Sequence, residues 1–113
     1  MAGSQEFLAF VLEQLDALPR LSARRMFGAT GLYSADVFFG IVSGDTLYLR
    51  VSAAGRGAAL RSGRAAFRPY AHRDLLSRSY FAVPAAVLED TEELTRWAAA
   101  AVAAAPRAGG RGR

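Results

Sequence analysis

Between residues 25 and 51 the chain alternates strand-forming runs with breaks of only two or three residues, and this spacing constrains the fold more than any other feature. The runs are rich in aromatic and β-branched side chains and cover residues 32–33, 37–42 and 46–51. Ser43-Gly44-Asp45-Thr46 has the form of a two-residue hairpin loop in which Gly44 can adopt a positive φ, and Ser34-Ala35-Asp36 is a second short turn. Because such short connections join antiparallel neighbours, we expect an antiparallel meander from about Arg25 to Val51.

Helices are predicted before and after this meander in the sequence. Residues 5–18 carry apolar side chains three and four positions apart, with Ser4 as the expected N-cap and Pro19 as the stop. A short helix is expected over residues 55–62, ended by Gly63. A third helix is expected from Asp90 to about residue 105, because Asp90 and Glu93 have the spacing of a capping box.

Two further strands, over residues 65–70 and 79–83, are expected between the second and third helices. The predicted order is α-β-β-β-α-β-β-α, and the predicted class is α+β, a mostly antiparallel five-stranded sheet with flanking helices. A length of 113 residues suits one domain, which we place at residues 1–105. Residues 106–113 are predicted to form a disordered Gly/Arg-rich tail.

The composition excludes several classes of site and location. The chain has no cysteine, which excludes disulfides, thiolate zinc sites, iron–sulfur clusters and cysteine nucleophiles. No apolar run has the length of about 20 residues that a bilayer requires, and the first residues show no signal-peptide pattern. We therefore expect a cytoplasmic protein with no membrane partner and no cofactor.

Positive charge is concentrated in one part of the chain. All 14 basic residues are arginine, and residues 1–105 hold 11 arginines against 10 acidic residues. Residues 51–80, however, contain only one acidic residue, Asp74, and six arginines: Arg56, Arg61, Arg64, Arg68, Arg73 and Arg78. This segment is a candidate nucleic-acid contact, provided that its arginines share one face.

The stretch RRMFGATGLY, residues 24–33, raises the question of a phosphate-binding loop. Such a loop needs a helix behind it, so that free N–H groups point at the anion, but Gly31 leads into another predicted strand. The glycines are therefore interpreted as a tight β-turn that requires a positive φ. Arg24 and Arg25 could reach a phosphate or carboxylate, although such a pair more often alternates across a strand.

Other candidate groups favour structural roles. His72 is the one histidine, has no metal-ligand partners at suitable spacing and is predicted to be an exposed loop residue. The acidic cluster at residues 89–93 fits a helix N-terminus better than acid–base catalysis. Aromatic residues on the strands can stack on bases, but no RNP1-type string occurs, so sheet packing is the better interpretation.

Several strings taken together resemble one known family. They include Arg25-Met26-Phe27-Gly28, Gly31-Leu32-Tyr33, Leu47-Tyr48-Leu49-Arg50, Ser79-Tyr80, Val83-Pro84 and Leu88-Glu89-Asp90 followed by Trp97-Ala98. The pattern is similar to the TfoX N-terminal domain family, which includes regulators of bacterial natural competence, and it covers about residues 5–105. The resemblance implies an α+β fold with a mostly antiparallel sheet and implies no catalytic residues. The chain resembles a stand-alone version without the second domain of better-known members, and Phe81 stands where relatives often have Trp.

Three functions remain open from the sequence. The first is a non-enzymatic regulatory or interaction module that acts through protein contacts, with homodimerisation as one form of such contact. The second is a nucleic-acid-binding domain that uses the basic segment 51–80. The third is an uncharacterised enzyme or small-ligand binder, for which a pocket lined by Arg25, Tyr33, Arg50 and Tyr80 would be the expected site.

Overall fold

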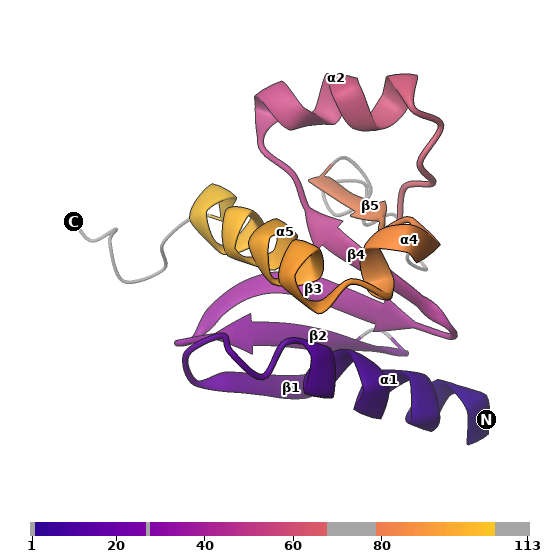
Figure 1. Ribbon diagram of the computed structural model, residues 1–113, viewed down its shortest axis with the longest axis vertical. Coiled ribbons are helices and arrows are strands. Elements are labelled where there is room, and N and C mark those ends of the chain that lie inside the picture. Colours follow the sequence, from indigo (N-terminus) through magenta and orange to yellow (C-terminus); the bar gives the residue numbers. More distant parts are fainter. Residues whose placement is uncertain (1, 27, 68–78, 106–113) are drawn as a thin grey trace.

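The computed structural model of the chain describes residues 2–26, 28–67 and 79–105. Figure 1 shows two layers, a twisted sheet and helices α1, α4 and α5 on one of its faces, with α2 beyond them. The strands are β1 (Leu21–Met26), β2 (Ala29–Ser34), β3 (Val37–Ser43), β4 (Thr46–Arg50) and β5 (Tyr80–Ala82). The helices are α1 (Ala2–Gln14), α2 (Ala53–Arg61), α4 (Ala85–Leu88) and α5 (Thr91–Ala104).

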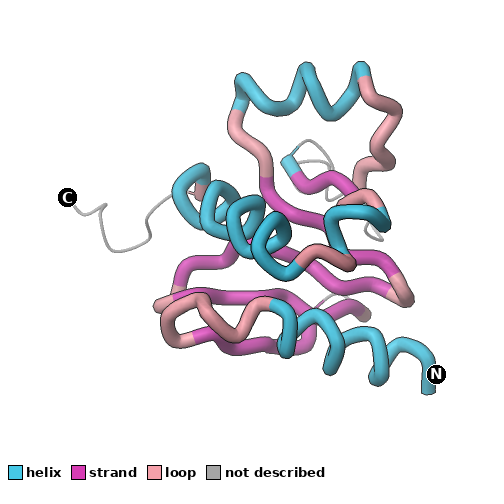
Figure 2. Tube along the Cα trace, in the orientation of Figure 1, coloured by secondary structure: helices cyan, strands magenta, loops and turns pink. Residues whose placement is uncertain are grey.

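The five strands lie in sequence order, β1-β2-β3-β4-β5, and every neighbouring pair is antiparallel. The predicted α+β class and five-stranded sheet are thus confirmed. The tube in Figure 2 makes the meander from β1 to β4 easy to follow, because only short loops separate these strands. Two of the loops are the expected two-residue turns, with positive φ at Ala35 and Asp36 in one and at Gly44 in the other.

The predicted order of elements is wrong, because in the described part of the chain four strands precede α2 and one follows it. The additional strand β1 gives little sequence signal, since its residues 22–25 are exposed at the sheet edge and do not alternate between apolar and polar. The strand expected over 65–70 is reduced to an isolated bridge between Ala66 and Phe81, and residues 68–70 lie outside the described part. The four-residue helix α4 was not predicted.

Helix boundaries also differ from the predicted ones. Helix α1 begins at Ala2, so Ser4 lies within it and is not its N-cap, and the helix ends at Gln14, four residues before the expected end. Helix α2 begins two residues before the expected start, after Ser52, whose Oγ accepts a hydrogen bond from the Gly55 N–H. Asp90 caps α5 as expected, because its Oδ1 accepts a 3.0 Å bond from the Glu93 N–H.

The main core lies between the sheet and the helices. Leu32, Phe39, Leu47 and Leu49 of the sheet pack against α1 and α5, and all four are at most 2% exposed. Hydrogen bonds of Gln14 join α1 to α4 and α5. Its Nε2 donates to the Leu88 carbonyl and its Oε1 accepts from the Thr91 hydroxyl, and both bonds are 2.8 Å long. This layer holds α5 firmly against the sheet.

Two adjacent phenylalanines of β3 lie on opposite faces of the sheet, and a β-bulge decides which of them faces the helices. Leu32 pairs with Gly40 but Tyr33 pairs with Phe38, so Phe39 is an extra residue on β3. Phe39 joins the core beneath the helices, whereas Phe38 packs on the other face. A side chain at Gly40 would lie 3.1 Å from Leu49 Cδ2 and 3.3 Å from the Tyr48 carbonyl oxygen, which explains the glycine beside the bulge.

The RRMFGATGLY stretch is a corner, as predicted, but only one of its glycines makes the turn. Gly28 has φ +75° between β1 and β2. Gly31 lies inside β2, where an added Cβ would come within 2.5 Å of Met26 Sδ and 3.2 Å of Phe38 Cε1. Gly28 thus adopts the positive φ that the turn requires, and Gly31 leaves space for the side chains of Met26 and Phe38.

Replacing Gly28 with alanine is expected to lower the free energy of unfolding by about 1 kcal/mol, because an L-residue resists the left-handed backbone region. The added Cβ would meet no atom within 4 Å, so the cost comes from the backbone alone. Urea unfolding followed by circular dichroism measures it. Gly57→Ala is the matched control: it lies in α2 and should raise stability by about 0.5–1 kcal/mol. Equal effects at both positions would contradict this account.

Candidate functional site

Three of the four residues expected to face a ligand meet on the sheet face opposite α1, α4 and α5. Arg50 on β4 pairs with Tyr80 on β5, and Arg50 Nη1 lies 3.5 Å from the Tyr80 hydroxyl oxygen. The Tyr80 ring lies 5.2 Å from Phe38, which lies 5.3 Å from the Tyr33 ring. The aromatic row therefore runs from β2 through β3 to β5.

The environment of the Arg50–Tyr80 pair is buried. Tyr80 is 0% exposed, and burial raises the pKa of its phenol above the usual 10.0, while the hydrogen bond from Arg50 opposes this rise. The guanidinium of Arg50 also lies 5.6 Å from the Tyr80 ring centroid. Its Nε is buried and bonds to no acceptor among residues 2–26, 28–67 and 79–105. Because Tyr80 is fully buried, the pair packs the sheet and presents no tyrosine hydroxyl to solvent.

Arg25, the fourth expected residue, lies on the other face. It pairs with Thr30, whereas Arg24 pairs with Gly31 and lies with its guanidinium carbon 4.6 Å above the Tyr33 ring. Arg25 lines a separate hollow of about 320 Å³ near α1 and the turn after β1, together with Gln5, Leu8, Gly28, Ala29, Thr30, Val42 and Gly44. The two adjacent arginines thus alternate across the strand, and the four expected residues do not line one pocket.

The six arginines of the basic segment divide into two groups. Arg68, Arg73 and Arg78 lie outside the described residues, as does His72, so their placement stays a prediction. Arg56 and Arg61 are exposed on α2, and their separation by five positions places them about 140° apart around the helix. Arg64 is turned inward against α5. The described arginines therefore do not form a single row.

A larger hollow lies between α2 and α5, beside the end of β4. It has a volume of about 360 Å³, and we call it the α2–α5 hollow. Its wall consists mainly of small or apolar residues together with three arginines: Leu49, Arg50, Val51, Ser52, Gly55, Ala58, Arg64, Arg96, Trp97, Ala100 and Ala104. No acidic side chain is among these lining residues. The first turn of α2 contributes Ser52 and Gly55, so the positive end of that helix dipole borders the hollow.

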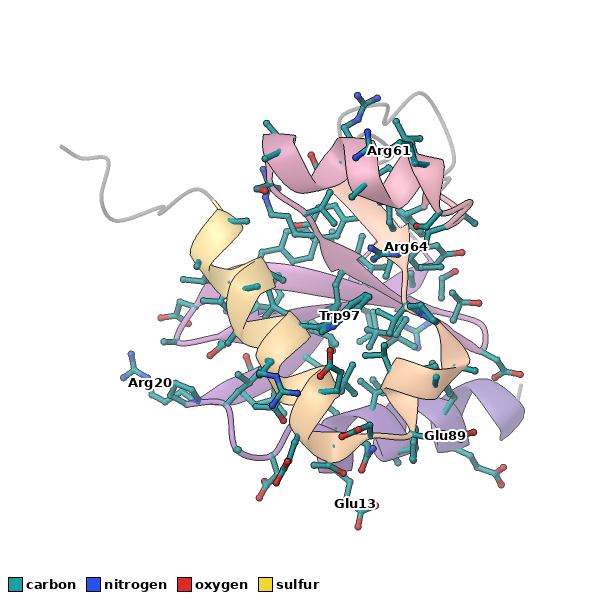
Figure 3. All side chains as sticks on the ribbon, turned by 45° about the horizontal axis from the view of Figure 1, so that its top comes forward. Glu13, Arg20, Arg61, Arg64, Glu89 and Trp97 are labelled. Carbon is teal, nitrogen blue, oxygen red and sulfur yellow. The ribbon has the colours of Figure 1, made fainter. Side chains whose placement is uncertain are left out.

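Arg64 and Trp97 both line this hollow, and their side chains are labelled in Figure 3. The Arg64 guanidinium carbon lies 4.9 Å from the Trp97 ring centroid. Arg64 Nε donates a 2.7 Å hydrogen bond to the Ala82 carbonyl, and Nη2 donates a 3.4 Å bond to the Phe81 carbonyl. Burial lowers the pKa of the Arg64 guanidinium below its usual value. The side chain thereby links the segment after α2 to both β5 and α5.

Glu93 contacts both Arg96 and Trp97. It forms an ion pair with Arg96 and accepts a 3.0 Å hydrogen bond from the Trp97 indole N–H. The hydrogen bond from Arg96, followed by that from Trp97, holds the pKa of Glu93 below its usual 4.5. The predicted capping box is therefore half formed, because the Glu93 carboxylate turns to these partners while Asp90 caps the helix.

Trp97 fluorescence is expected to titrate with a midpoint below pH 4.5 in the folded protein, because protonation of Glu93 removes the acceptor of the indole N–H. Since the folded-state pKa is depressed, the ionised carboxylate stabilises the fold above the unfolded pKa, and this contribution is lost as the pH falls through the folded-state value. Trp97 is the only tryptophan, so its emission reports this site directly. A Glu93→Gln variant should lose the transition, and an unchanged titration would contradict the assignment.

Sequence reasoning did not identify the α2–α5 hollow. Arg64 was grouped with the nucleic-acid candidates, and Trp97 was used only as part of a family pattern. Their contact joins residues 33 positions apart and depends on β5, whose carbonyls accept hydrogen bonds from the Arg64 guanidinium. A hint was present in the spacing of Glu93, Arg96 and Trp97, which share one side of a helix at i, i+3 and i+4.

The described residues contain no group of three or more histidine, cysteine, aspartate or glutamate side chains arranged to hold a metal ion. Within the same ranges, no helix is long and apolar enough to cross a bilayer. The acidic cluster at 89–93 lies around the start of α5, where Glu92 and Glu93 occupy its first turn. This position agrees with the helix-dipole role inferred from the sequence.

The family model described as TfoX N-terminal domain matches residues 13–105, which include the whole sheet, α2, the hollow and α5. No curated protein matches the chain. The matched range contains every residue of the α2–α5 hollow.

Proposed function

Because the chain belongs to the TfoX N-terminal domain family, we propose that it is a competence-regulator-like module that acts in the cytoplasm through protein contacts and without catalysing a reaction. The observation that carries the proposal is the surface of α2. This helix of nine residues buries only Ala59, while Leu60 is 53% exposed. Figure 1 shows α2 standing apart from the layer of α1, α4 and α5.

The composition of this surface supports a protein partner. Leu60 is the most exposed large hydrophobic residue in the described part of the chain, and Arg61 is exposed next to it. An exposed apolar residue beside arginine is typical of interface centres, where such side chains become buried on binding. Because α2 contributes only one buried residue to the protein core, most of its surface is available for a partner.

Site-specific photo-crosslinking in cells tests the proposal. A photoreactive residue at position 60 is expected to give a discrete adduct, and one at position 13 is not, because Glu13 is exposed on the distant helix α1. Excess unlabelled protein should suppress the adduct in extracts, whereas excess Leu60→Glu protein should not. The same adduct pattern from positions 60 and 13 would overturn the proposal. An adduct of twice the chain mass would identify a second copy as the partner.

A further inference from the structure

The α2–α5 hollow has the size and lining of a small-molecule site. Its volume of about 360 Å³ lies at the lower end of the range of roughly 300–1,000 Å³ that such sites occupy. Apolar atoms dominate the wall, which includes Leu49, Ala58, Ala100 and Ala104 together with Trp97. A few polar groups beside an apolar wall are the usual arrangement for binding a ligand that has a polar head and an apolar body.

Arg64 supplies a cationic group that has no anionic partner within the described ranges of the chain. Two of its five N–H donors bond to the carbonyls of Ala82 and Phe81, which leaves three donors. Among the described residues, no carboxylate lies within salt-bridge distance of this guanidinium. A half-buried cation that bonds to neutral carbonyls and covers an aromatic ring is stabilised when an anion binds beside it.

The surrounding charges favour a ligand with one negative charge. Glu93 neutralises Arg96 at the rim, so Arg96 adds little net charge to the hollow. The first turn of α2 borders the same space and adds a partial positive charge. A bare inorganic anion would leave the alanine wall without contacts, whereas a hydrocarbon body would cover it.

We propose that the α2–α5 hollow binds a small monocarboxylate with a hydrocarbon body, in the size class of octanoate, with its carboxylate at Arg64 and its body along Ala58, Ala100 and Ala104. This site is independent of the exposed face of α2 that the proposed function uses. The structure also supplies the reporter, because Trp97 is the only tryptophan and its ring lines the hollow.

Titration of the full chain with sodium octanoate at constant ionic strength, followed by Trp97 fluorescence, tests the proposal. A saturable change is expected with a dissociation constant on the order of 1 mM or tighter. Butanoate should bind at least about tenfold more weakly because it buries fewer methylene groups, and so should octanol because it lacks the charge. Absence of saturation in the millimolar range, or equal responses to octanoate and octanol, would overturn the proposal.

Variants separate binding from changes in the reporter. Arg64→Gln should weaken octanoate binding by about tenfold or more, because it removes the charged donor. Ala100→Leu keeps every arginine but fills part of the hollow with a larger side chain, so it should also weaken octanoate binding. Arg24→Gln, on the distant strand β1, removes the same charge and should leave the affinity unchanged. Equal weakening by Arg24→Gln, or full affinity in both hollow variants, would show that the charge acts without a site.

Chemical-shift mapping gives a second measurement that does not depend on Trp97. Octanoate should shift the backbone amides of Ser52, Gly55 and Ala100 and leave those of β1 unchanged. Shifts confined to β1 or spread evenly over the chain would contradict the assigned site. Because crosslinking at position 60 tests the proposed function separately, failure of octanoate binding would leave that result unaffected.

Discussion

Replacing Phe39 with alanine is expected to lower the free energy of unfolding by about 4 kcal/mol, near the middle of the range for a buried phenylalanine. Phe39 is 0% exposed and lies in the core between the sheet and the helices. The bulge on β3 commits this residue to the helix side, so the cavity would open directly beneath α5. Urea unfolding measures the effect. An unchanged m-value, the dependence of the unfolding free energy on urea concentration, would show that the denatured state is not altered.

Phe38→Ala is the matched control, because the two residues are chemically identical and adjacent. Phe38 is only half-buried and packs on the other face against Tyr33 and Tyr80. Its replacement should cost about half as much or less, since the surface removed from contact is smaller. Equal losses at the two positions would contradict the bulge as the feature that assigns Phe39 to the core.

The sheet could be predicted because its signals are local. Two-residue turns at Ala35-Asp36 and Gly44-Asp45 determine which strands are neighbours, and both were visible as short polar breaks. Strand β1 was missed because an exposed edge strand buries no face and therefore needs no alternation. Its pairing with β2 depends on Gly28 and on the neighbouring strand more than on its own residues.

The candidate site could be predicted only where it follows strand register. Arg50 and Tyr80 were chosen as strand residues with polar ends, and β4–β5 pairing places them opposite each other. Arg25 was chosen on the same grounds, but a shift of one position puts it on the other face, and Arg24 takes the place beside Tyr33. Register alone could not reveal the hollow, because that space depends on how α2 and α5 pack around β5.

Arg64→Ala is expected to lower the free energy of unfolding by about 2–3 kcal/mol, from lost hydrogen bonds of a charged donor and a lost cation–π contact. The reason is positional: Arg64 donates to the Ala82 and Phe81 carbonyls and covers Trp97, so it ties the end of α2 to β5 and α5. Urea unfolding followed by both Trp97 emission and far-UV circular dichroism measures the effect. Emission of the folded variant should also change, because the ring loses its cationic neighbour.

Arg61→Ala provides the control for charge, since Arg61 is exposed on α2 three residues earlier. It should alter stability by no more than about 0.5 kcal/mol, as expected for an exposed side chain. Arg64→Lys tests geometry. Lysine keeps the charge but lacks the planar guanidinium that bonds two carbonyls and covers an aromatic ring at the same time. It should therefore recover less than half of the lost stability. Full recovery would mean that charge alone matters, and equal losses for Arg61→Ala and Arg64→Ala would mean that the contact with Trp97 adds nothing.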